Sequence, residues 1–237
     1  MSVDAILFIE VDPMPFIPDS AGSGPMLPIT ITRTVGGAVV VADLDIPPDV
    51  DVTVYMWGSG GSGAGGPPGA PPGGGGGGST GALLVTFPAA VWATVDSITL
   101  ANGVAAGAAN TDGLNGEDTI IAAGATNLAI AGKGLKGLVA GGVGGLGGTN
   151  TVHASVTTIR DWPGAVGSNG VGAVGGTGGT SLAPGSGAGG AGGTAAPGPG
   201  GQGMNPGGGG GGGGAGGAQP GGLSRQGKLV FTFALPG

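Results

Sequence analysis

The sequence predicts a mainly β protein with extensive irregular structure, in which a β-strand frame holds packed polyglycine-II-type left-handed helices and almost no α-helix. Three observations carry this prediction. Glycine accounts for 64 and proline for 19 of the 237 residues, and both disfavour helix interiors. Several short segments are rich in β-branched residues with alternating polarity, which is typical of strands. Glycine also recurs with a three-residue period, as in an extended helix of three residues per turn.

The opening 27 residues differ from the rest of the chain. AILFIEV is followed by DPMPFIPDSAGSGPMLP, and closely spaced prolines favour an extended backbone without internal hydrogen bonds. Apolar residues such as Phe8 and Phe16 indicate an arm that docks on another surface, with a frayed terminus as the alternative. We therefore divide the chain into an extended attachment arm, residues 1–27, and a glycine-rich domain, residues 28–237.

Strand-like segments frame this domain over residues 28–160 and again over 228–236. The first are ITITRTV, GGAVVVADLDIP and DVTVYMW, within residues 28–57. The later candidates are ALLVTFP (82–88), VDSITLA (95–101), DTIIAA (118–123), NLAIA (127–131), TVHASVTTI (151–159) and KLVFTFALP (228–236). The last segment is expected to pair with the first and so close the domain.

Glycine fills the space between these segments. GGVGGLGG (141–148) has a strict three-residue period, which places Val143, Leu146 and Thr149 on one face of an extended helix. Such a helix forms no internal hydrogen bonds, so its backbone groups need partners on neighbouring chains, and bare glycine faces allow that approach. A flexible glycine-rich linker is the alternative. Phase slips and the pure glycine run 207–214 argue against a collagen triple helix.

Charge is scarce and unevenly placed. Six basic and 13 acidic residues give a net charge of −7, and no charged residue lies between Trp162 and Ser224. A basic face for nucleic-acid binding is therefore not expected. No apolar run free of Gly and Pro is long enough to span a bilayer, and the N-terminus lacks a basic region typical of a signal peptide. With no cysteine, the chain has neither disulfides nor thiolate chemistry.

Several motifs suggest chemistry, but each has a simpler structural interpretation. Gly58, Gly60 and Gly63 match the spacing G-x-G-x-x-G of dinucleotide-binding loops, yet a double proline follows where a helix would have to begin. GLNGEDTI (113–120) resembles one turn of a calcium-binding nonapeptide repeat with Asp118 as ligand, but only one copy is present. His153 is the single histidine, and the early acidic residues look like an exposed turn: Asp43, Asp45, Asp49 and Asp51. We expect no catalytic residues, cofactor or metal site, and no enzyme activity.

The order of the motifs resembles the glycine-rich domain of bacteriophage tail proteins, adhesins and fibre tips. The resemblance rests on WGSGGSG (57–63) after a strand, GGGGGG (73–78), NGEDTIIAAG (115–124), GG-x-GG blocks and a closing strand, KLVFTF. It covers roughly residues 28–237 and implies a compact stack of polyglycine-type helices carried on a virion. The proline-bearing section 184–206 and the N-terminal arm depart from the family pattern, which leaves the point of receptor contact open.

The function expected from this resemblance is that of a virion structural protein in the phage tail, a minor tail or fibre-tip component that contributes to host attachment. Its expected partners are other tail proteins and a host cell-surface receptor or glycan, and a homo-oligomer, as a trimer, is expected. The candidate receptor contacts are Trp162, Asn169, Met204 and Asn205, near the tips of glycine hairpins. The alternatives are an ice-binding protein, which would show regular threonine columns that do not recur in this sequence, and a bacterial glycine-rich cell-surface protein, which GAGGAGGTAAPG (187–198) resembles.

Overall fold

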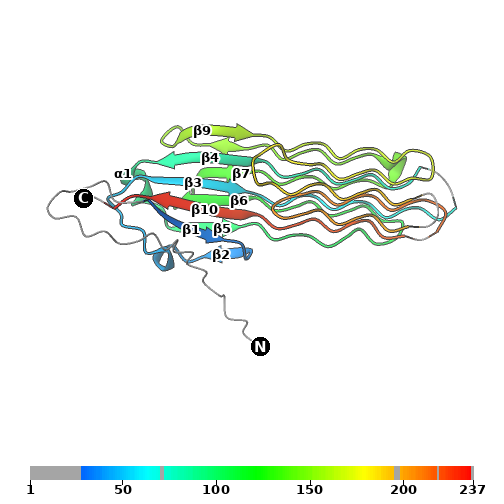
Figure 1. The fold of residues 1–237 in the computed structure, drawn as a ribbon, viewed down its shortest axis with the longest axis horizontal. Helices are drawn as coiled ribbons and strands as arrows, with labels where there is room; N and C mark the ends of the chain where they lie inside the picture. Colours follow the sequence, from blue (N-terminus) through cyan, green and yellow to red (C-terminus); the bar gives the residue numbers. More distant parts are fainter. Residues whose placement is uncertain (1–27, 70–71, 195–197, 218, 236–237) are drawn as a thin grey trace, which may run out of the picture.

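The computed structural model describes residues 28–69, 72–194, 198–217 and 219–235. The predicted attachment arm, residues 1–27, lies outside the described residues. Figure 1 shows an elongated molecule whose strands gather at one end, while the glycine-rich segments run side by side toward the other end. The two parts are continuous, because most strands lead directly into or out of a glycine-rich segment.

The first sheet has the strand order β1-β10-β3-β4-β9, and all neighbours are antiparallel. Its strands are β1 (Ile29–Arg33), β10 (Lys228–Phe233), β3 (Val52–Trp57), β4 (Ala82–Phe87) and β9 (Thr157–Trp162). The pairing of β1 with β10 confirms the prediction that the last strand closes the domain against the first.

The second sheet has the order β2-β5-β6-β7-β8 and is also antiparallel. Its strands are β2 (Gly37–Val39), β5 (Ser97–Leu100), β6 (Thr119–Ala123), β7 (Thr126–Ala131) and β8 (Thr151–Val152). Helix is limited in the described residues to η1 (Val41–Leu44), α1 (Ala89–Trp92) and η2 (Ala140–Gly142). The predicted mainly β fold with almost no α-helix is confirmed.

Two predicted strands are wrong in part. GGAVVVADLDIP (36–47) forms a strand only over β2, and its residues Val41–Leu44 form the 3-10 helix η1. Residues 151–159 were expected to form a single strand, but β8 lies in the second sheet and β9 begins only at Thr157, in the first. A turn separates them, in which the Val156 N–H donates to the His153 carbonyl at 3.0 Å and Nδ1 of His153 lies 2.9 Å from Oγ of Ser155. The β-branched composition continues through this turn, so composition alone does not mark the crossing between sheets.

The apolar core lies between the two sheets. Alternate residues of β3 and β10 are buried, as expected for strands with one face on a core. Phe87 and Phe231 each pack edge-on against Trp92, which covers the core from α1. The buried cluster combines residues from both sheets: Val52, Val54, Met56, Leu83, Val85, Phe87, Ile98, Leu100, Ile121, Leu128, Leu229, Phe231 and Phe233.

Beyond the sheets, the chain forms extended segments that we call the glycine bundle. Few of its residues belong to a helix or strand. The segments are 58–66, 73–81, 101–110, 111–118, 132–138, 143–150, 163–171, 174–182, 186–194, 198–204, 207–215 and 219–227. Adjacent strands continue as adjacent segments, so the order of each sheet carries over into the bundle.

Hydrogen bonding within the bundle has a three-residue period, as segment 73–81 shows. The N–H groups of residues 73, 76 and 79 donate to segment 163–171 or its turn, those of 74, 77 and 80 to segment 207–215, and those of 75, 78 and 81 to segment 132–138. Carbonyl groups of the same segment accept from segments 58–66, 143–150 and 174–182. Segment 73–81 therefore bonds to six neighbours, as in a hexagonal packing of threefold helices.

Three segments have six such neighbours and form the centre of the bundle: 58–66, 73–81 and 207–215. They also bond to one another, through pairs such as Ala64 with Gly75 and Gly77 with Gly210. The other nine described segments surround them in a closed ring that follows the chain from 101–110 to 198–204 and returns through 219–227. All residues of the three central segments are buried. The alternative of a flexible linker is thus wrong for the described glycine-rich residues.

Glycine is required at the centre because neighbouring backbones occupy the space that a side chain would need. A Cβ atom on Gly76 would overlap the carbonyl of Thr177, and one on Gly212 would overlap the carbonyl of Gly74. In the ring, this steric constraint applies only to positions that face the centre of the bundle or an adjacent ring segment. The column Val143, Leu146 and Thr149 is exposed, as the glycine period predicts.

Candidate functional site

The four predicted receptor contacts do not form one site. Trp162 ends β9, where the sheet meets the bundle, and Met204 and Asn205 lie at the turn between segments 198–204 and 207–215, also on the sheet side. Asn169 lies toward the other end of the bundle, where its Oδ1 accepts a hydrogen bond from the Gly144 N–H at 2.9 Å. Met204 is 63% exposed, whereas Trp162 is half-buried.

Trp162 belongs to an aromatic cluster on the outer face of the first sheet. Its ring centroid lies 5.4 Å from that of Tyr55, which in turn lies 3.7 Å from that of Trp57. The turn after segment 174–182 covers this cluster, since Tyr55 donates to the Pro184 carbonyl at 2.8 Å and Trp57 Nε1 donates to Ser186 Oγ at 3.0 Å. Burial raises the pKa of the Tyr55 hydroxyl to about 12. The cluster therefore fastens the bundle to the sheet.

Polar side chains take the place of missing neighbours at the edge of the bundle. Asp112, Asn115 and Asp118 recur every third residue, and their Oδ1 atoms accept hydrogen bonds from the N–H groups of Val139, Lys136 and Lys133 at 3.0, 3.0 and 2.8 Å. Two ion pairs reinforce this ladder, Lys136 with Asp112 at 3.0 Å and Lys133 with Asp118 at 3.5 Å. The Val139 N–H and the Lys136 ammonium together lower the pKa of Asp112.

The ladder also gives Asp118 a structural task. Its carboxylate serves one backbone amide and one ammonium group, at the end of segment 111–118 where β6 begins. Across the described residues, the side chains form no cluster of three or more potential metal ligands. The match to one turn of a calcium repeat thus arises from a three-residue capping pattern, in which acidic and amide side chains accept hydrogen bonds from the neighbouring backbone.

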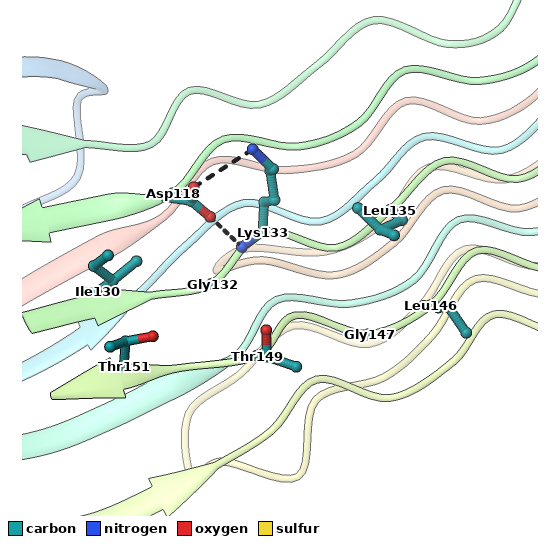
Figure 2. A pocket seen from close by; sticks show the side chains of 9 residues that line it. All are labelled: Asp118, Ile130, Gly132, Lys133, Leu135, Leu146, Gly147, Thr149 and Thr151. Carbon is teal, nitrogen blue, oxygen red and sulfur yellow. Dashed lines mark hydrogen bonds and ion pairs between the residues drawn. The ribbon is translucent and has the colours of Figure 1, made fainter.

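Beside this ladder lies a groove of about 420 Å³ between segments 132–138 and 143–150. Figure 2 shows Asp118 and Lys133 on one flank, Thr149 and Leu146 on the other, and Ile130 and Thr151 where the groove reaches the sheet. Gly132 and Gly147 also line it. The groove combines hydroxyl, charged and apolar groups around bare backbone, and we take it as the candidate binding surface.

Backbone groups of both segments face this groove. In segment 73–81 the C=O and N–H of one residue point to adjacent neighbours: the Gly76 carbonyl accepts from Gly145, and its N–H donates to Ser168 in the next segment of the ring. The Leu146 carbonyl accepts from Leu135. In the same way, the C=O of Leu146 points to segment 132–138, and its N–H points to the next position around segment 143–150, which is the groove.

Segment 132–138 forms the other side of the groove, and its chain runs in the opposite direction. There too, the C=O and N–H of one residue point to adjacent positions around the segment. The carbonyls of Lys133 and Lys136 point toward the position that the N–H groups of Leu146 and Thr149 face. Within the described part of the chain, none of these four groups has a protein hydrogen-bond partner. The groove is therefore lined by N–H donors on one side and carbonyl acceptors on the other, and the side chain of Leu135 also lines it.

Sequence reasoning did not identify this groove. The signal is present, because Lys133 and Lys136 are three residues apart and Val143, Leu146 and Thr149 follow the same period. The period assigns residues to faces of each segment, but it does not reveal which two segments lie side by side. That depends on ring closure through contacts distant in sequence.

The comparisons with known proteins add no assignment. No protein-family model matches the chain, and no curated protein matches it at a significant level. Among the described residues, no helix is long and apolar enough to cross a membrane.

Proposed function

We propose that the protein is a structural component of a bacteriophage virion, a minor tail or tail-fibre-tip protein that contributes to attachment to the host surface. The observation that carries this proposal is the closed glycine bundle. It projects from a β-sandwich and presents turns at its far end, among them residues 67–69, 139–142 and 171–174. A rod held by backbone hydrogen bonds is a stiff support for such contact loops.

The proposal agrees with the resemblance in motif order and with the distribution of charge. Acidic and basic side chains of the described bundle are confined to segments 111–118, 132–138 and 219–227, and the remaining ring presents uncharged side chains, among them the exposed apolar residues Leu146, Leu182 and Met204. Such a surface suits close packing against other proteins of a particle. The partners proposed are other tail proteins and a host receptor or glycan.

The test is particle assembly with and without this chain. We expect virions that lack it to assemble but to lose adsorption to host cells, and restoration of the gene to recover adsorption. Mass spectrometry of purified particles gives an independent readout, because the chain must be found in the tail. Particles that do not contain the chain would contradict the virion assignment. Normal adsorption of particles that lack it would leave only a structural role.

One observation favours ice binding as a second candidate. The outer face of the first sheet carries one row of threonines across all five strands, in the order Thr30, Thr232, Thr53, Thr86 and Thr157. Oγ1 of Thr53 and Oγ1 of Thr86 lie 3.0 Å apart. Neighbouring strands lie about 4.8 Å apart, so the threonines of this row recur at that spacing, which can order water. Thermal hysteresis in dilute solution that is lost in Thr53→Val would support this candidate, and its absence would exclude it.

A further inference from the structure

A second pocket, of about 260 Å³, lies where the outer face of the first sheet meets the bundle, and we call it the junction pocket. Its lining comes from four parts of the chain that are distant in sequence: Thr34, Gly185, Asn205, Pro206, Gln226 and Lys228. Ligand pockets of proteins typically measure about 300–1,000 Å³, so this one has room for a single sugar ring or a group of similar size. It shares no lining residue with the groove beside segment 132–138.

Hydrogen bonds within the chain hold the walls of the junction pocket. One turn is fastened to the sheet, because Trp57 Nε1 donates to Ser186 Oγ at 3.0 Å. The Pro206 carbonyl accepts the N–H of the residue after Ser186 at 2.8 Å, which joins the two turns of the pocket. The side-chain amide of Gln226 donates to the carbonyl of Thr34 and so fixes a third wall. A pocket formed in this way before binding spends little free energy on ordering its walls around a ligand.

Among the lining residues, the one charged group is the ammonium group of Lys228. It lies 5.8 Å from the ring centroid of Trp57, a contact that holds the lysine against the outer face of the sheet. Both ion pairs of the described residues involve other lysines, so no described carboxylate is paired with Lys228. In the groove beside segment 132–138, by contrast, Lys133 is paired with Asp118. The junction pocket therefore offers a cation that the described chain does not neutralise.

A second cation lies close to this pocket along the chain. Arg225 donates from Nε to the Gly203 carbonyl at 3.1 Å and from Nη2 to Gln202 Oε1 at 2.8 Å, so both of these partners are neutral. Gly203 precedes Asn205 by two residues, which places this positive charge next to the turn that lines the pocket. No acidic residue lines the pocket, although the whole chain carries a net charge of −7. Positive charge at this position favours an anionic ligand.

The neutral polar groups of the pocket suit a hydroxylated ring. The side chains of Asn205 and Gln226 each carry an amide that can donate and accept hydrogen bonds, and Thr34 adds a hydroxyl group. Within the described residues, the Asn205 side chain has no hydrogen-bond partner. The ring of Pro206 adds apolar surface. A simple inorganic anion would use the lysine alone, whereas a sugar that carries a carboxylate would use all of these groups.

We propose that the junction pocket binds a sugar that carries a carboxylate, such as a uronic acid or a sialic acid. The carboxylate accepts hydrogen bonds from the ammonium group of Lys228, and the sugar hydroxyls bond to the amides of Asn205 and Gln226. Asn205 is one of the receptor contacts predicted from the sequence, and the exposed Met204 precedes it. The source of the sugar, a host-surface glycan, rests on the proposed function, whereas binding by the purified chain does not.

The test measures binding of the full-length chain to immobilised glycans that contain uronic or sialic acids. Each glycan is compared with its carboxyl-reduced form, in which a hydroxymethyl group replaces the carboxylate and the ring is retained. We expect carboxyl reduction to weaken binding by at least about tenfold, because the charge-assisted hydrogen bond to Lys228 is lost. Equal binding of the two forms, or no binding to any of the acidic glycans, would overturn the proposal. Phosphorylated sugars that bind as tightly as the carboxylated ones would also overturn it, because charge alone would then be recognised.

Two pairs of variants locate the binding site. Lys228→Gln removes the cation of the pocket, and Arg160→Gln removes an exposed cation from the β9 edge of the same sheet. Asn205→Asp adds a negative charge in the pocket with little change in side-chain size, and Asn169→Asp adds the same charge toward the other end of the bundle. We expect Lys228→Gln and Asn205→Asp to weaken binding by at least about tenfold and the two controls to leave it unchanged. Circular dichroism shows whether each variant remains folded.

The outcomes of this test are separate from those for the virion assignment. Particles that contain the chain, together with purified chain that binds no acidic glycan, would contradict the pocket alone. A chain that binds acidic glycans but is absent from particles would contradict the virion assignment alone. Equal losses of binding in Lys228→Gln and Arg160→Gln would show a general effect of surface charge and would overturn the assignment of the sugar to the junction pocket.

Discussion

The N–H of Gly77 donates to the carbonyl of Gly210 at 2.8 Å, which joins the two pure glycine runs of the chain, 73–78 and 207–214, at the centre of the bundle. Each run is surrounded by six hydrogen-bonded segments. The longest stretches without side chains are therefore those with the most neighbours. Glycine acts here as a packing residue, and the entropy lost on ordering it is offset by a shared lattice of backbone hydrogen bonds.

The first prediction concerns a methyl group at this centre. In Gly77→Ala the new Cβ would meet the backbone carbonyls of Gly61 and Ser62, which cannot move without breaking hydrogen bonds of their own. We expect a loss of about 3 kcal/mol or more in unfolding free energy, measured by urea denaturation. Gly103→Ala is the control, because its nearest neighbour atoms lie at 3.0 Å in the outer ring, and we expect it to cost less than about 1 kcal/mol.

The second prediction concerns a buried hydroxyl. Oγ of Ser62 accepts the N–H of Leu114 at 2.7 Å, so that a serine of the central segment 58–66 bonds to the ring. Ser62→Ala leaves this amide without a partner and should cost about 1–3 kcal/mol in thermal or urea unfolding. The exposed change Thr177→Ala serves for comparison. Equal stability of Ser62→Ala and the wild type would show that the hydroxyl is not a structural acceptor.

The third prediction concerns acid. The Val139 N–H and the Lys136 ammonium hold the pKa of Asp112 below its ordinary value of 3.8. A lowered pKa in the folded state stabilises the protein above the ordinary value, and this contribution is lost as the pH falls through the folded value. Asp112→Asn, which retains a carbonyl acceptor, should therefore lose less stability than the wild type between pH 6 and pH 2. Parallel curves for both proteins would contradict the effect.

The fourth prediction concerns alkali. The pKa of Tyr55 is raised from 10.0 to about 12, so its neutral form stabilises the fold below pH 10, and the contribution is lost as the pH rises from 10 to about 12. Absorbance at the phenolate band should show the single tyrosine ionising late. Tyr55→Phe should remove this part of the alkaline loss of stability. Titration of the folded protein near pH 10 would show that the hydroxyl is not shielded beneath the turn at Pro184.

Much of this architecture can be predicted from the sequence, because glycine and proline exclude helices and the glycine period assigns faces. Val143 and Leu146 are exposed as that period requires. The ring of nine segments around three was not predictable, because its hydrogen bonds join residues as distant as Gly63 and Gly222. The groove was not predictable for the same reason, since it lies where two segments are side by side without an outer neighbour. The sequence predicts that the candidate contact Trp162 lies near a hairpin tip, whereas it lies at the end of β9. Its position depends on the turn before β9, which composition does not reveal.

The most direct measurement of the central claim is amide hydrogen exchange of the full chain, resolved by residue. We expect residues 74–80 and 208–214 to exchange only through global unfolding, because each of their amides is bonded to a neighbouring segment. The turn residues Gly69 and Gly172 should exchange rapidly. Fast exchange throughout the two pure glycine runs would contradict the account, since a tether has no such lattice to protect it.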